Sequence, residues 1–362
     1  MTKKIEKEIK ESTKKENKKV LHLLTSNIYS GAENVAITII EQLHENYNSI
    51  YACTDGPIIN VLKEKNIEYI ILKKASIRYI KKAVKRIKPD LIHAHGFQTS
   101  VKYSLSGLKI PYISHLHNNN PWLRKINLKS IMYLLAGIKA KKILLVSDSI
   151  EKEYVFSKYF KEKFINIGNP IGREKIINMV SEKEKAKKYD ICCVGRLVEQ
   201  KEPLKFIDII KKIKLENPNI KALWVGDGEL YNLCCEKVKS LNLEKNIEFI
   251  GFKKNPYQYM SQSQIFLLPS KWEGFGLVAF EALALGIPCV VSNVGGLPGI
   301  VNDSCGFLCN SEDEFVNSSL KLLNDNNKLM KYKENAIKQS KKIDNYKYYF
   351  KIIEETYVNV LK

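Results

Sequence analysis

Short apolar, β-rich runs alternate with stretches of helical period along most of this chain. In the first half the runs lie at residues 20–26, 50–54, 69–73, 91–95, 112–117 and 142–147. Because a strand that is regularly followed by a helix builds βαβ units, this alternation predicts a parallel sheet with helices packed against it. Residues 1–19 are mostly Lys and Glu, and we expect a flexible tail there because they have little apolar surface to bury.

A second series of strands begins after the turn at residues 168–170. Its runs lie at residues 189–195, 220–226, 246–251, 265–270 and 288–293, and they are nearly continuous in Val, Ile, Leu and Cys, as strands covered on both faces are. Since 362 residues exceed one ordinary core, we predict two Rossmann-like, doubly wound parallel-sheet domains facing a cleft, at residues 20–168 and 169–340. Residues 341–362 are expected to form a C-terminal helix that packs back on the N-terminal domain.

Composition narrows the protein class. No apolar run reaches the length of a membrane span, and the N-terminus is charged rather than apolar, so we expect neither a membrane helix nor a secretory signal, and a cytoplasmic protein. The eight cysteines fall mostly inside apolar runs, without paired CxxC units. This usage predicts buried, reduced thiols rather than disulfides or a zinc site.

Positive charge is concentrated in the first half of the chain. Residues 1–170 hold 30 Lys and Arg against 15 Asp and Glu, whereas the remainder holds 29 against 24. Such an excess suggests an anionic membrane surface, nucleic acid or acidic substrates, although a Lys-rich composition alone would produce it too. No recognised nucleic-acid module accompanies the charge, so we expect no nucleic-acid partner.

Two segments are candidates for contact with an anionic membrane. Residues 76–88 predict a helix with a basic surface and an apolar stripe of Ile77, Ile80, Val84 and Ile87. Residues 120–125 add an aromatic and basic segment. Together they could hold the protein peripherally on the inner face of the plasma membrane. Ordinary core contact explains the stripe equally well.

Ligands of doubly wound sheets bind at the carboxyl ends of the strands, where this chain has its candidate site residues. Arg196 and Lys201 follow the first strand of the second series, just before a helix expected near Pro203, and predict an anion site. Gly226 and Gly228 follow the next strand. Glycines there let the backbone approach a ligand, but a Gly-Asp-Gly turn is also common.

The segment from Pro269 to Pro288 carries the strongest pattern. Glu273 lies in a loop after a buried strand, and Glu281 follows eight positions later in a helix that begins near Gly276. Carboxylates accept hydrogen bonds from sugar hydroxyls, and the amides of residues 275–277 can meet a phosphate. Alternatively, the two carboxylates could serve only to stabilise the positive end of a helix dipole, but this role leaves the glycines unexplained.

The first half contributes a short glycine loop and four histidines. Ser30-Gly31-Ala32-Glu33 follows the first strand and opens a helix, without GxGxxG or a P-loop pattern, which disfavours a dehydrogenase or a P-loop enzyme. The histidines stand at strand ends, and alternation puts each pair on one face; they are His93, His95, His115 and His117. We favour substrate contact over a metal site, because no carboxylate or Cys accompanies them.

Taken together, these residues resemble the large retaining glycosyltransferase family called group 1, or family 4, of the GT-B fold. The resemblance covers Val20 to Cys309. Its most specific element is the E-x7-E pattern of Glu273 and Glu281, followed by GR…K and SNVGGLPGIV. SGAE, IHAH, SHLH, LLVSDSI and INIGNPI occur in the order of that family. The chain departs from it in having Gly-Asn-Pro-Ile where Asn-Gly-Val is frequent, and one glycine where the first loop usually has two.

The resemblance implies a role for each matching position. Arg196 and Lys201 would hold the donor diphosphate, Glu281 the ribose, and His117 would lie near the reacting sugar. Glu273 would contact the transferred sugar and the distal phosphate together with the backbone of Gly274, Phe275, Gly276 and Leu277. Further donor-binding positions would be Gly31 from the opposite domain, Gly195 and Gly226 at strand ends, and Gly251, Phe252 and Lys253 along the base.

The function implied is a retaining, metal-independent glycosyltransferase without a cofactor. It would move a hexose or N-acetylhexosamine from a nucleotide diphosphate sugar, with UDP favoured, to a saccharide or lipid-linked acceptor in cell-surface polysaccharide or glycolipid synthesis. The N-terminal domain would face the acceptor and the C-terminal domain would bind the nucleotide sugar. Alternatives are a hydrolase with paired carboxylates, a related epimerase or phosphorylase, and a non-catalytic sugar-nucleotide-binding protein.

Overall fold

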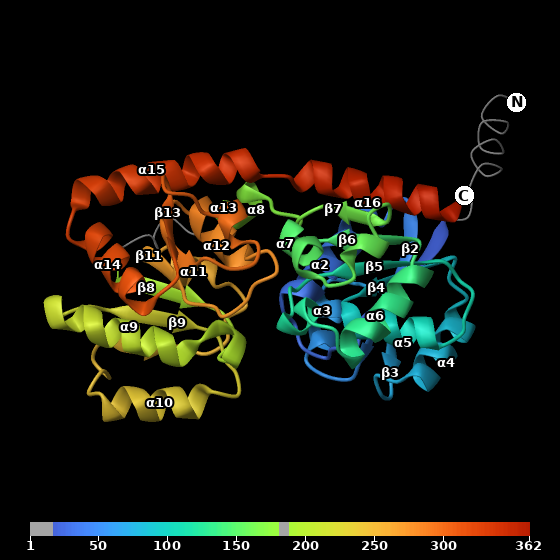
Figure 1. Ribbon diagram of the computed structural model, residues 1–362, viewed down its shortest axis with the longest axis horizontal. Coiled ribbons are helices and arrows are strands. Elements are labelled where there is room, and N and C mark those ends of the chain that lie inside the picture. Colours follow the sequence, from blue (N-terminus) through green and yellow to red (C-terminus); the bar gives the residue numbers. More distant parts are fainter. Residues whose placement is uncertain (1–16, 181–187) are drawn as a thin grey trace, which may run out of the picture.

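The computed structural model describes residues 17–180 and 188–362, and it contains two α/β domains side by side (Figure 1). The first domain has a seven-stranded sheet of order β3-β2-β1-β4-β5-β6-β7, and the second a six-stranded sheet of order β10-β9-β8-β11-β12-β13. Every strand pair within the two sheets is parallel. The predicted fold class, two doubly wound parallel-sheet domains, is therefore confirmed.

All eleven apolar runs singled out in the sequence contain a strand. In the first sheet the strands are β1 (Lys18–Leu23), β2 (Tyr47–Thr54), β3 (Tyr69–Leu72), β4 (Leu91–His95), β5 (Tyr112–Leu116), β6 (Lys142–Leu145) and β7 (Phe164–Asn166). In the second they are β8 (Tyr189–Val194), β9 (Ala222–Val225), β10 (Ile247–Phe249), β11 (Ser263–Leu268), β12 (Cys289–Ser292) and β13 (Gly306–Cys309). Sequence reasoning missed β7 and β13, which are short strands at sheet edges.

The start of β1 corrects one expectation. Lys18 and Lys19, which we assigned to the flexible tail, belong to the strand and pair with Tyr47 and Asn48 of β2. The backbone N–H of Lys19 also donates to the carboxylate of Asp90 over 2.8 Å. Strand pairing satisfies these backbone groups whatever the polarity of the side chains. The rest of the predicted tail, residues 1–16, lies outside the described part of the chain.

Helices cover both faces of the first sheet. One face carries α4 (Ile77–Ile87), α5 (Phe97–Leu105) and α6 (Leu128–Lys139), which are neighbours in that order. The remaining helices of this domain are α2 (Gly31–Leu43), α3 (Ile58–Glu64), α7 (Asp148–Glu153) and the short 3-10 helices η1 (Pro121–Arg124) and η2 (Ser157–Tyr159). The apolar stripe predicted on residues 76–88 is core contact: Ile80 and Val84 are buried and Ile77 and Ile87 half-buried.

The last helix of the chain, α16 (Tyr346–Leu361), lies across the N-terminal domain (Figure 1). Its buried residues Tyr349, Ile353 and Tyr357 pack with strand residues such as Val20 and Leu91, on the sheet face that α2 also covers. Its start corrects another boundary. Residues 341–343, which we counted with the terminal helix, end α15 (Asn326–Ile343), and the two helices are separated at residues 344–345.

The second domain is built around the larger core. It contains Trp224, Phe206 and Phe280 among its fully buried side chains. The helices before α15 are α8 (Arg173–Asn178), η4 (Glu199–Lys201), α9 (Pro203–Glu216), α10 (Tyr231–Ser240), α11 (Tyr257–Met260), α12 (Leu277–Ala284), α13 (Leu297–Ile300) and α14 (Glu312–Leu323). All eight cysteines lie in the described residues, and no disulfide joins them.

The carboxyl ends of the two sheets face each other. Gly31 follows β1 and Leu277 follows β11; a Cβ on Gly31 would lie 3.9 Å from the Leu277 side chain. Gly274, in the loop that leads to Leu277, lies against the backbone of His117, which follows β5. The strand ends where ligands of this fold class bind thus meet at the domain interface.

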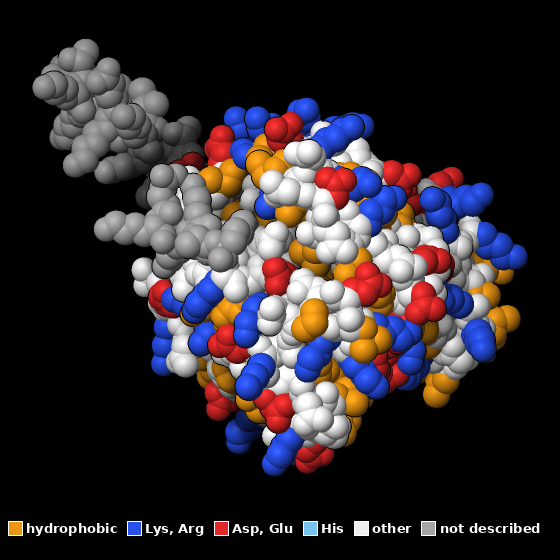
Figure 2. Space-filling model, turned by 90° about the vertical axis from the view of Figure 1, so that its left-hand side faces the viewer, with side chains coloured by type: hydrophobic (Ala, Val, Ile, Leu, Met, Phe, Trp, Pro, Cys, Tyr) orange, Lys and Arg blue, Asp and Glu red, His pale blue; other side chains and the backbone are white. Residues whose placement is uncertain are grey.

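The surface of the C-terminal domain carries charges of both signs. Figure 2 shows the end formed by the C-terminal domain, where basic, acidic and apolar side chains are interspersed. The excess of positive charge belongs to the other half of the sequence. Within residues 17–180 and 188–362, no helix has the length and apolar character needed to cross a bilayer.

Candidate active site

An ion pair between Lys201 and Glu273 lies at the carboxyl edge of the second sheet. Lys201 ends η4, directly after β8, and its ammonium donates to the Glu273 carboxylate, which follows β11. Ser270 Oγ donates to the same carboxylate over 2.8 Å. Only 16% of the Lys201 side chain and 7% of the Glu273 side chain are exposed. Such a pair holds both groups in a fixed orientation, because few other positions would satisfy the buried charges.

The local sequence explains where Lys201 lies. Glu202 takes the left-handed backbone conformation with φ of 52° and turns the chain into α9, where Pro203 occupies the first position. A Cβ on Gly195 would lie 3.4 Å from the aliphatic carbons of Lys201. Gly195 therefore gives room to the lysine stem, in addition to its predicted position beside the ligand.

Arg196 differs from Lys201 in its surroundings. It is exposed and, within the described residues, makes no side-chain hydrogen bond or ion pair. The structure thus brings Lys201 to Glu273 and leaves the guanidinium of Arg196 exposed at the same sheet edge, with no partner among residues 17–180 and 188–362. A guanidinium in that position can reorient toward a bound phosphate and contact it with two donors.

Glu281 lies in the second turn of α12, close enough to Lys201 for attraction between the charges. The hydroxyl of Tyr257, on α11, donates to its carboxylate over 3.1 Å. Burial raises the pKa of Glu281 to about 7, against the opposing effects of the Tyr257 hydrogen bond and of Lys201. Sequence reasoning missed Tyr257, because nothing in residues 257–260 indicates which strand end α11 faces.

Glycines make the loop between Glu273 and α12 possible. Gly276 has φ of 94°, a left-handed conformation that favours glycine, and directly precedes α12. A Cβ on Gly274 would lie 2.3 Å from the carbonyl oxygen of His117 in the other domain. A Cβ on Gly295 would lie 1.9 Å from the carbonyl oxygen of Glu273. Gly274 therefore permits the close approach of the domains, and Gly295 supports the loop from behind. Phe275, between Gly274 and Gly276, packs against the cores of both domains.

The stretch predicted to line the base lies at the ends of β9 and β10. The N–H of Gly226 donates to the carbonyl of Gly251 over 2.9 Å, and a Cβ on Gly226 would lie 2.0 Å from the carbonyl oxygen of Gly195. Phe252 is 60% exposed. The ammonium of Lys253 lies 5.8 Å from the ring centre of Tyr259. Gly226 is thus required for strand-end packing, while Phe252 leaves an aromatic face open to a ligand.

The N-terminal domain contributes the glycine loop and the histidines. Gly31 begins α2, and the Ser30 hydroxyl donates to the carboxylate of Glu33 in the first turn. His117 is half-buried at the domain interface. The four predicted histidines cluster as expected from strand alternation, and His22 of β1 joins them. The substrate contact expected of His93, His95 and His115 is wrong, because these three side chains are buried in the sheet; of the four, His117 is the one placed to meet a ligand. Sequence reasoning missed His22, because only the strand order places β1 next to β4.

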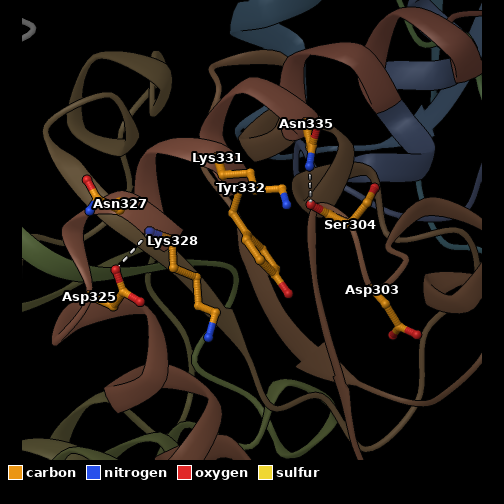
Figure 3. A pocket seen from close by; sticks show the side chains of 8 residues that line it. All are labelled: Asp303, Ser304, Asp325, Asn327, Lys328, Lys331, Tyr332 and Asn335. Carbon is orange, nitrogen blue, oxygen red and sulfur yellow. Dashed lines mark hydrogen bonds between the residues drawn. The ribbon is translucent and has the colours of Figure 1, made fainter.

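One surface hollow adjoins these residues, and a second lies apart from them. A hollow of about 220 Å³ at the carboxyl ends of β11 and β12 is lined by Ser270 and Lys271 among others, and so adjoins Glu273. A larger hollow of about 530 Å³, shown in Figure 3, lies between α15 and the loop before β13. Its wall includes Asp303, Asp325 and Lys328 but none of the side chains described above. The larger hollow is therefore a surface feature separate from the ion pair.

Comparisons with known proteins follow the same two-domain division. Residues 29–171 match the family described as Glycosyltransferase Family 4, and residues 174–339 match Glycosyl transferases group 1. The UDP-Gal:α-D-GlcNAc-diphosphoundecaprenol α-1,3-galactosyltransferase of Escherichia coli is 29% identical over 342 residues, covering 85% of this chain and 88% of that protein. A glycosyltransferase of Methanocaldococcus jannaschii is 31% identical over 70% of this chain and 71% of that protein.

A solved structure shares the whole architecture. Anabaena HepE in complex with UDP and glucose is similar with a TM-score of 0.85 and 20% sequence identity, over 95% of this chain and 100% of that chain. At that identity the similarity establishes a common fold.

Proposed function

We propose a specific reaction from the premise that this chain belongs to the group 1 family of glycosyltransferases. In this proposal it transfers a hexose or N-acetylhexosamine from a UDP-sugar to a lipid-linked saccharide, with retention of anomeric configuration and without a metal. The observation that carries it is the Lys201–Glu273 pair at the domain interface, with the exposed Arg196 at the same sheet edge. The UDP donor is further supported by the E. coli relative, which uses UDP-Gal, and by HepE, which binds UDP.

Charge development at the leaving group explains the basic residues. As the glycosidic bond breaks, the nucleotide diphosphate gains negative charge, and fixed cations aimed at it lower the barrier. Lys201 is held ready by Glu273, and Arg196 is available to the phosphates. These cations would offset the charge on the diphosphate that a bound metal ion offsets in other transferases. Glu273 is engaged by Lys201 and Ser270, which leaves it poorly suited as a covalent nucleophile. We therefore infer same-face attack by the acceptor, which gives retention.

The acceptor is inferred from the E. coli relative, which acts on a GlcNAc-diphosphoundecaprenol. A comparable saccharide on a polyprenyl diphosphate would be presented at a membrane surface. The reaction of this protein would then contribute to the assembly of a cell-surface polysaccharide or glycolipid at the inner face of the plasma membrane.

A donor and acceptor panel tests this function. The purified protein would be incubated with UDP-, GDP- and ADP-sugars, with and without a GlcNAc-diphospho-lipid, and products followed by mass spectrometry. We expect a glycosylated lipid from one UDP-sugar, with the α configuration of the donor by NMR, and unchanged rate in EDTA. Conversion of one nucleotide sugar into another without acceptor would indicate an epimerase. Formation of a sugar phosphate from inorganic phosphate would indicate a phosphorylase. Binding without any product would indicate a sugar-nucleotide sensor.

The pH dependence of donor binding tests the role of Glu281. The ionised carboxylate accepts hydrogen bonds from ribose hydroxyls, and the protonated form offers a weaker acceptor. Because the pKa of Glu281 is about 7, we expect affinity for the UDP-sugar to fall as the pH drops through that value. The dissociation constant from calorimetry should be up to about tenfold weaker near pH 6 than near pH 8. Glu281→Gln should bind weakly at both; a wild-type affinity independent of pH would contradict the assignment.

The outer face of α6 exposes an apolar stripe that suits a membrane-bound acceptor. Its members stand three or four residues apart and so share one side of the helix: they are Leu128, Ile131, Leu135 and Ile138, each between 40% and 74% exposed. Ile126, just before the helix, is 68% exposed. The opposite side of α6 buries Tyr133, Ala136 and Gly137. Single exposed apolar residues are ordinary, but a contiguous stripe marks an interaction surface.

Basic residues surround this stripe. Lys125, Lys129 and Lys139 are exposed beside it, and α4, which is next to α5 on the same sheet face, adds further exposed Lys and Arg. Over residues 20–168 the chain has 22 Lys and Arg against 11 Asp and Glu. An apolar stripe within a basic surround is complementary to an anionic bilayer, which takes up apolar side chains and attracts each nearby cation by about 1 kcal/mol. In our proposal α6, rather than the apolar side of α4, contacts the membrane.

Serine substitutions in the stripe test this contact. Leu128→Ser with Leu135→Ser should lower partitioning onto vesicles containing about one third phosphatidylglycerol by roughly 10- to 100-fold, because two large side chains lose their apolar environment. Co-sedimentation measures the effect. The matched control is Leu215→Ser on α9, 82% exposed in the other domain, which should bind as wild type. Equal vesicle binding by the stripe variant and the control would contradict the proposal. If the wild-type protein does not bind vesicles but forms a dimer that the stripe substitutions abolish, the stripe contacts a second copy of the chain instead.

A further inference from the structure

A row of three histidines crosses the first sheet toward the domain interface. Nδ1 of His22 lies 3.2 Å from Nε2 of His95, and Nδ1 of His95 lies 2.9 Å from Nε2 of His117. The three residues come from β1, β4 and the end of β5, which are adjacent in the sheet. His22 is therefore the inner end of the row, and His117, at the domain interface, is the outer end.

A second row runs beside the first. The hydroxyl of Tyr357, on α16, lies 2.6 Å from Nδ1 of His93, and Nε2 of His93 lies 3.1 Å from Nδ1 of His115. The rings of the two rows stack on each other, with centroids 4.2 Å apart for His93 and His95. Five of the six histidines of the chain thus form one stack beneath α16, in which His117 is half-buried and the other four are buried.

Ring geometry favours hydrogen bonds over a shared metal ion. Within the first row the ring planes are nearly parallel, at 23° and 13°, and the centroids are 5.4 and 5.1 Å apart, which places the facing nitrogens on the line between the rings. This is the geometry of an N–H···N bond. Rings joined end to end in this way point their facing nitrogens at each other rather than at one common point. Among the described residues, the clusters that could hold an ion contain histidines alone, with no carboxylate or thiolate to offset its charge.

Proton counting restricts the first row to two states. Burial lowers the pKa of His22 and of His117 to about 3 and that of His95 well below its usual value, so the rings are neutral at physiological pH. A neutral imidazole has one N–H and one lone pair. Since each of the two N···N contacts needs one proton, the three N–H groups must all point outward, toward His117, or all inward, toward His22.

The ends of the row distinguish these states. Nε2 of His22 and Nδ1 of His117 are buried, and neither has a hydrogen-bond partner in the described part of the chain. In the inward state the N–H on His22 stays permanently unsatisfied, and a buried donor without an acceptor is rare and costly. In the outward state the N–H without a protein partner in the described residues is that of His117, which is half-buried at the domain interface, whereas His22 is fully buried. After a small movement, water in the ligand-free protein, or a phosphate or sugar oxygen in the complex, can accept it there.

We propose that the row of His22 and His95 fixes His117 in the tautomer protonated on Nδ1, so that His117 offers an N–H to an oxygen of the bound sugar nucleotide. His95 and His22 are then positioning residues, acting through His117. The inference deepens the proposed function and rests on it for the identity of the ligand. The tautomer itself is a property of the ligand-free protein.

Nitrogen NMR reads this tautomer directly. In protein labelled with ¹⁵N-histidine, and with His117→Gln used for assignment, we expect a protonated, pyrrole-like Nδ1 and an unprotonated, pyridine-like Nε2 for His117 at neutral pH. The opposite pattern, a doubly protonated ring, or one equivalent of bound metal in the untagged protein by mass spectrometry would overturn the inference. The expected pattern in a protein that transfers no sugar would leave the tautomer assignment standing and refute the proposed function.

Kinetics of matched variants provide the second readout. His95→Phe keeps a stacked ring but removes both hydrogen bonds of the first row, and should lower kcat about 10- to 100-fold with little change in KM. His115→Phe breaks the second row and leaves the first intact, so kcat should stay within about threefold. The exposed His44→Gln controls for general effects. Equal losses in His95→Phe and His115→Phe, with His117 keeping its Nδ1 proton in both, would assign His95 to packing and overturn the proposal.

Discussion

Replacing Lys201 by methionine is expected to lower kcat by about 10²- to 10³-fold while the protein stays folded. Methionine retains the aliphatic stem that lies against Gly195 but removes the cation that we propose stabilises the leaving diphosphate. Loss of one group that stabilises charge in the transition state typically has an effect of this size. Product formation at saturating donor measures kcat, and circular dichroism verifies the fold.

The variant also leaves Glu273 without its ion-pair partner. Removing one member of a buried pair destabilises by about 3–5 kcal/mol, so Lys201→Met is compared with the double variant Lys201→Met/Glu273→Gln. The double variant should recover stability but not turnover. Lys271→Met is the matched control, because Lys271 is an exposed lysine two residues before Glu273 and pairs with Glu199. Near-normal turnover in folded Lys201→Met would refute the catalytic role of Lys201.

Replacing Gly274 by alanine is expected to lower kcat/KM at least about 100-fold with little loss of stability. The added methyl group would lie 2.3 Å from the carbonyl oxygen of His117. Because that atom belongs to the backbone of the other domain, relief requires the domains to move apart. A misplacement of about 1 Å in an active site has effects of this order. Each domain keeps its own core, so the melting temperature should change little.

Gly299→Ala is the matched control for Gly274→Ala. A Cβ on Gly299 meets no atom within 4 Å, and the residue lies in α13, in the same domain. It should retain wild-type kcat/KM. Small-angle scattering of Gly274→Ala should show a larger radius of gyration. Wild-type activity of Gly274→Ala would show that the close approach of the two domains has no part in the reaction.

Local sequence pattern determined the architecture. Parallel strands covered on both faces need continuous apolar runs, and turns and helices between them need a different period, so the runs from residue 20 to residue 293 located most strands. The same pattern brought the candidate residues to strand ends. Arg196, Lys201 and Glu273 could be named because each lies in the segment that follows such a run. Their roles remain proposals.

Tertiary structure decided which helix faces are buried. In α4 and α6 alike, the sequence shows apolar residues at helical spacing. In α4 they face the core, whereas in α6 the branched aliphatic residues Leu128, Ile131, Leu135 and Ile138 face outward. The inner side of α6 carries Tyr133, Ala136 and Gly137, with the ring of Phe160 directly against Gly137. Periodicity gives the spacing of a stripe but not its direction.

Contacts between distant segments were likewise beyond the sequence. His22 meets His95, and Tyr357 meets His93, because the strand order puts β1 beside β4 and α16 returns across the first sheet. Tyr257 reaches Glu281 for the same reason, from a separate helix. The sequence by itself determined the strands, the helices and the residues at their ends, since these follow from local periodicity. Which of those residues touch was decided by strand order and domain packing, which depend on the whole chain.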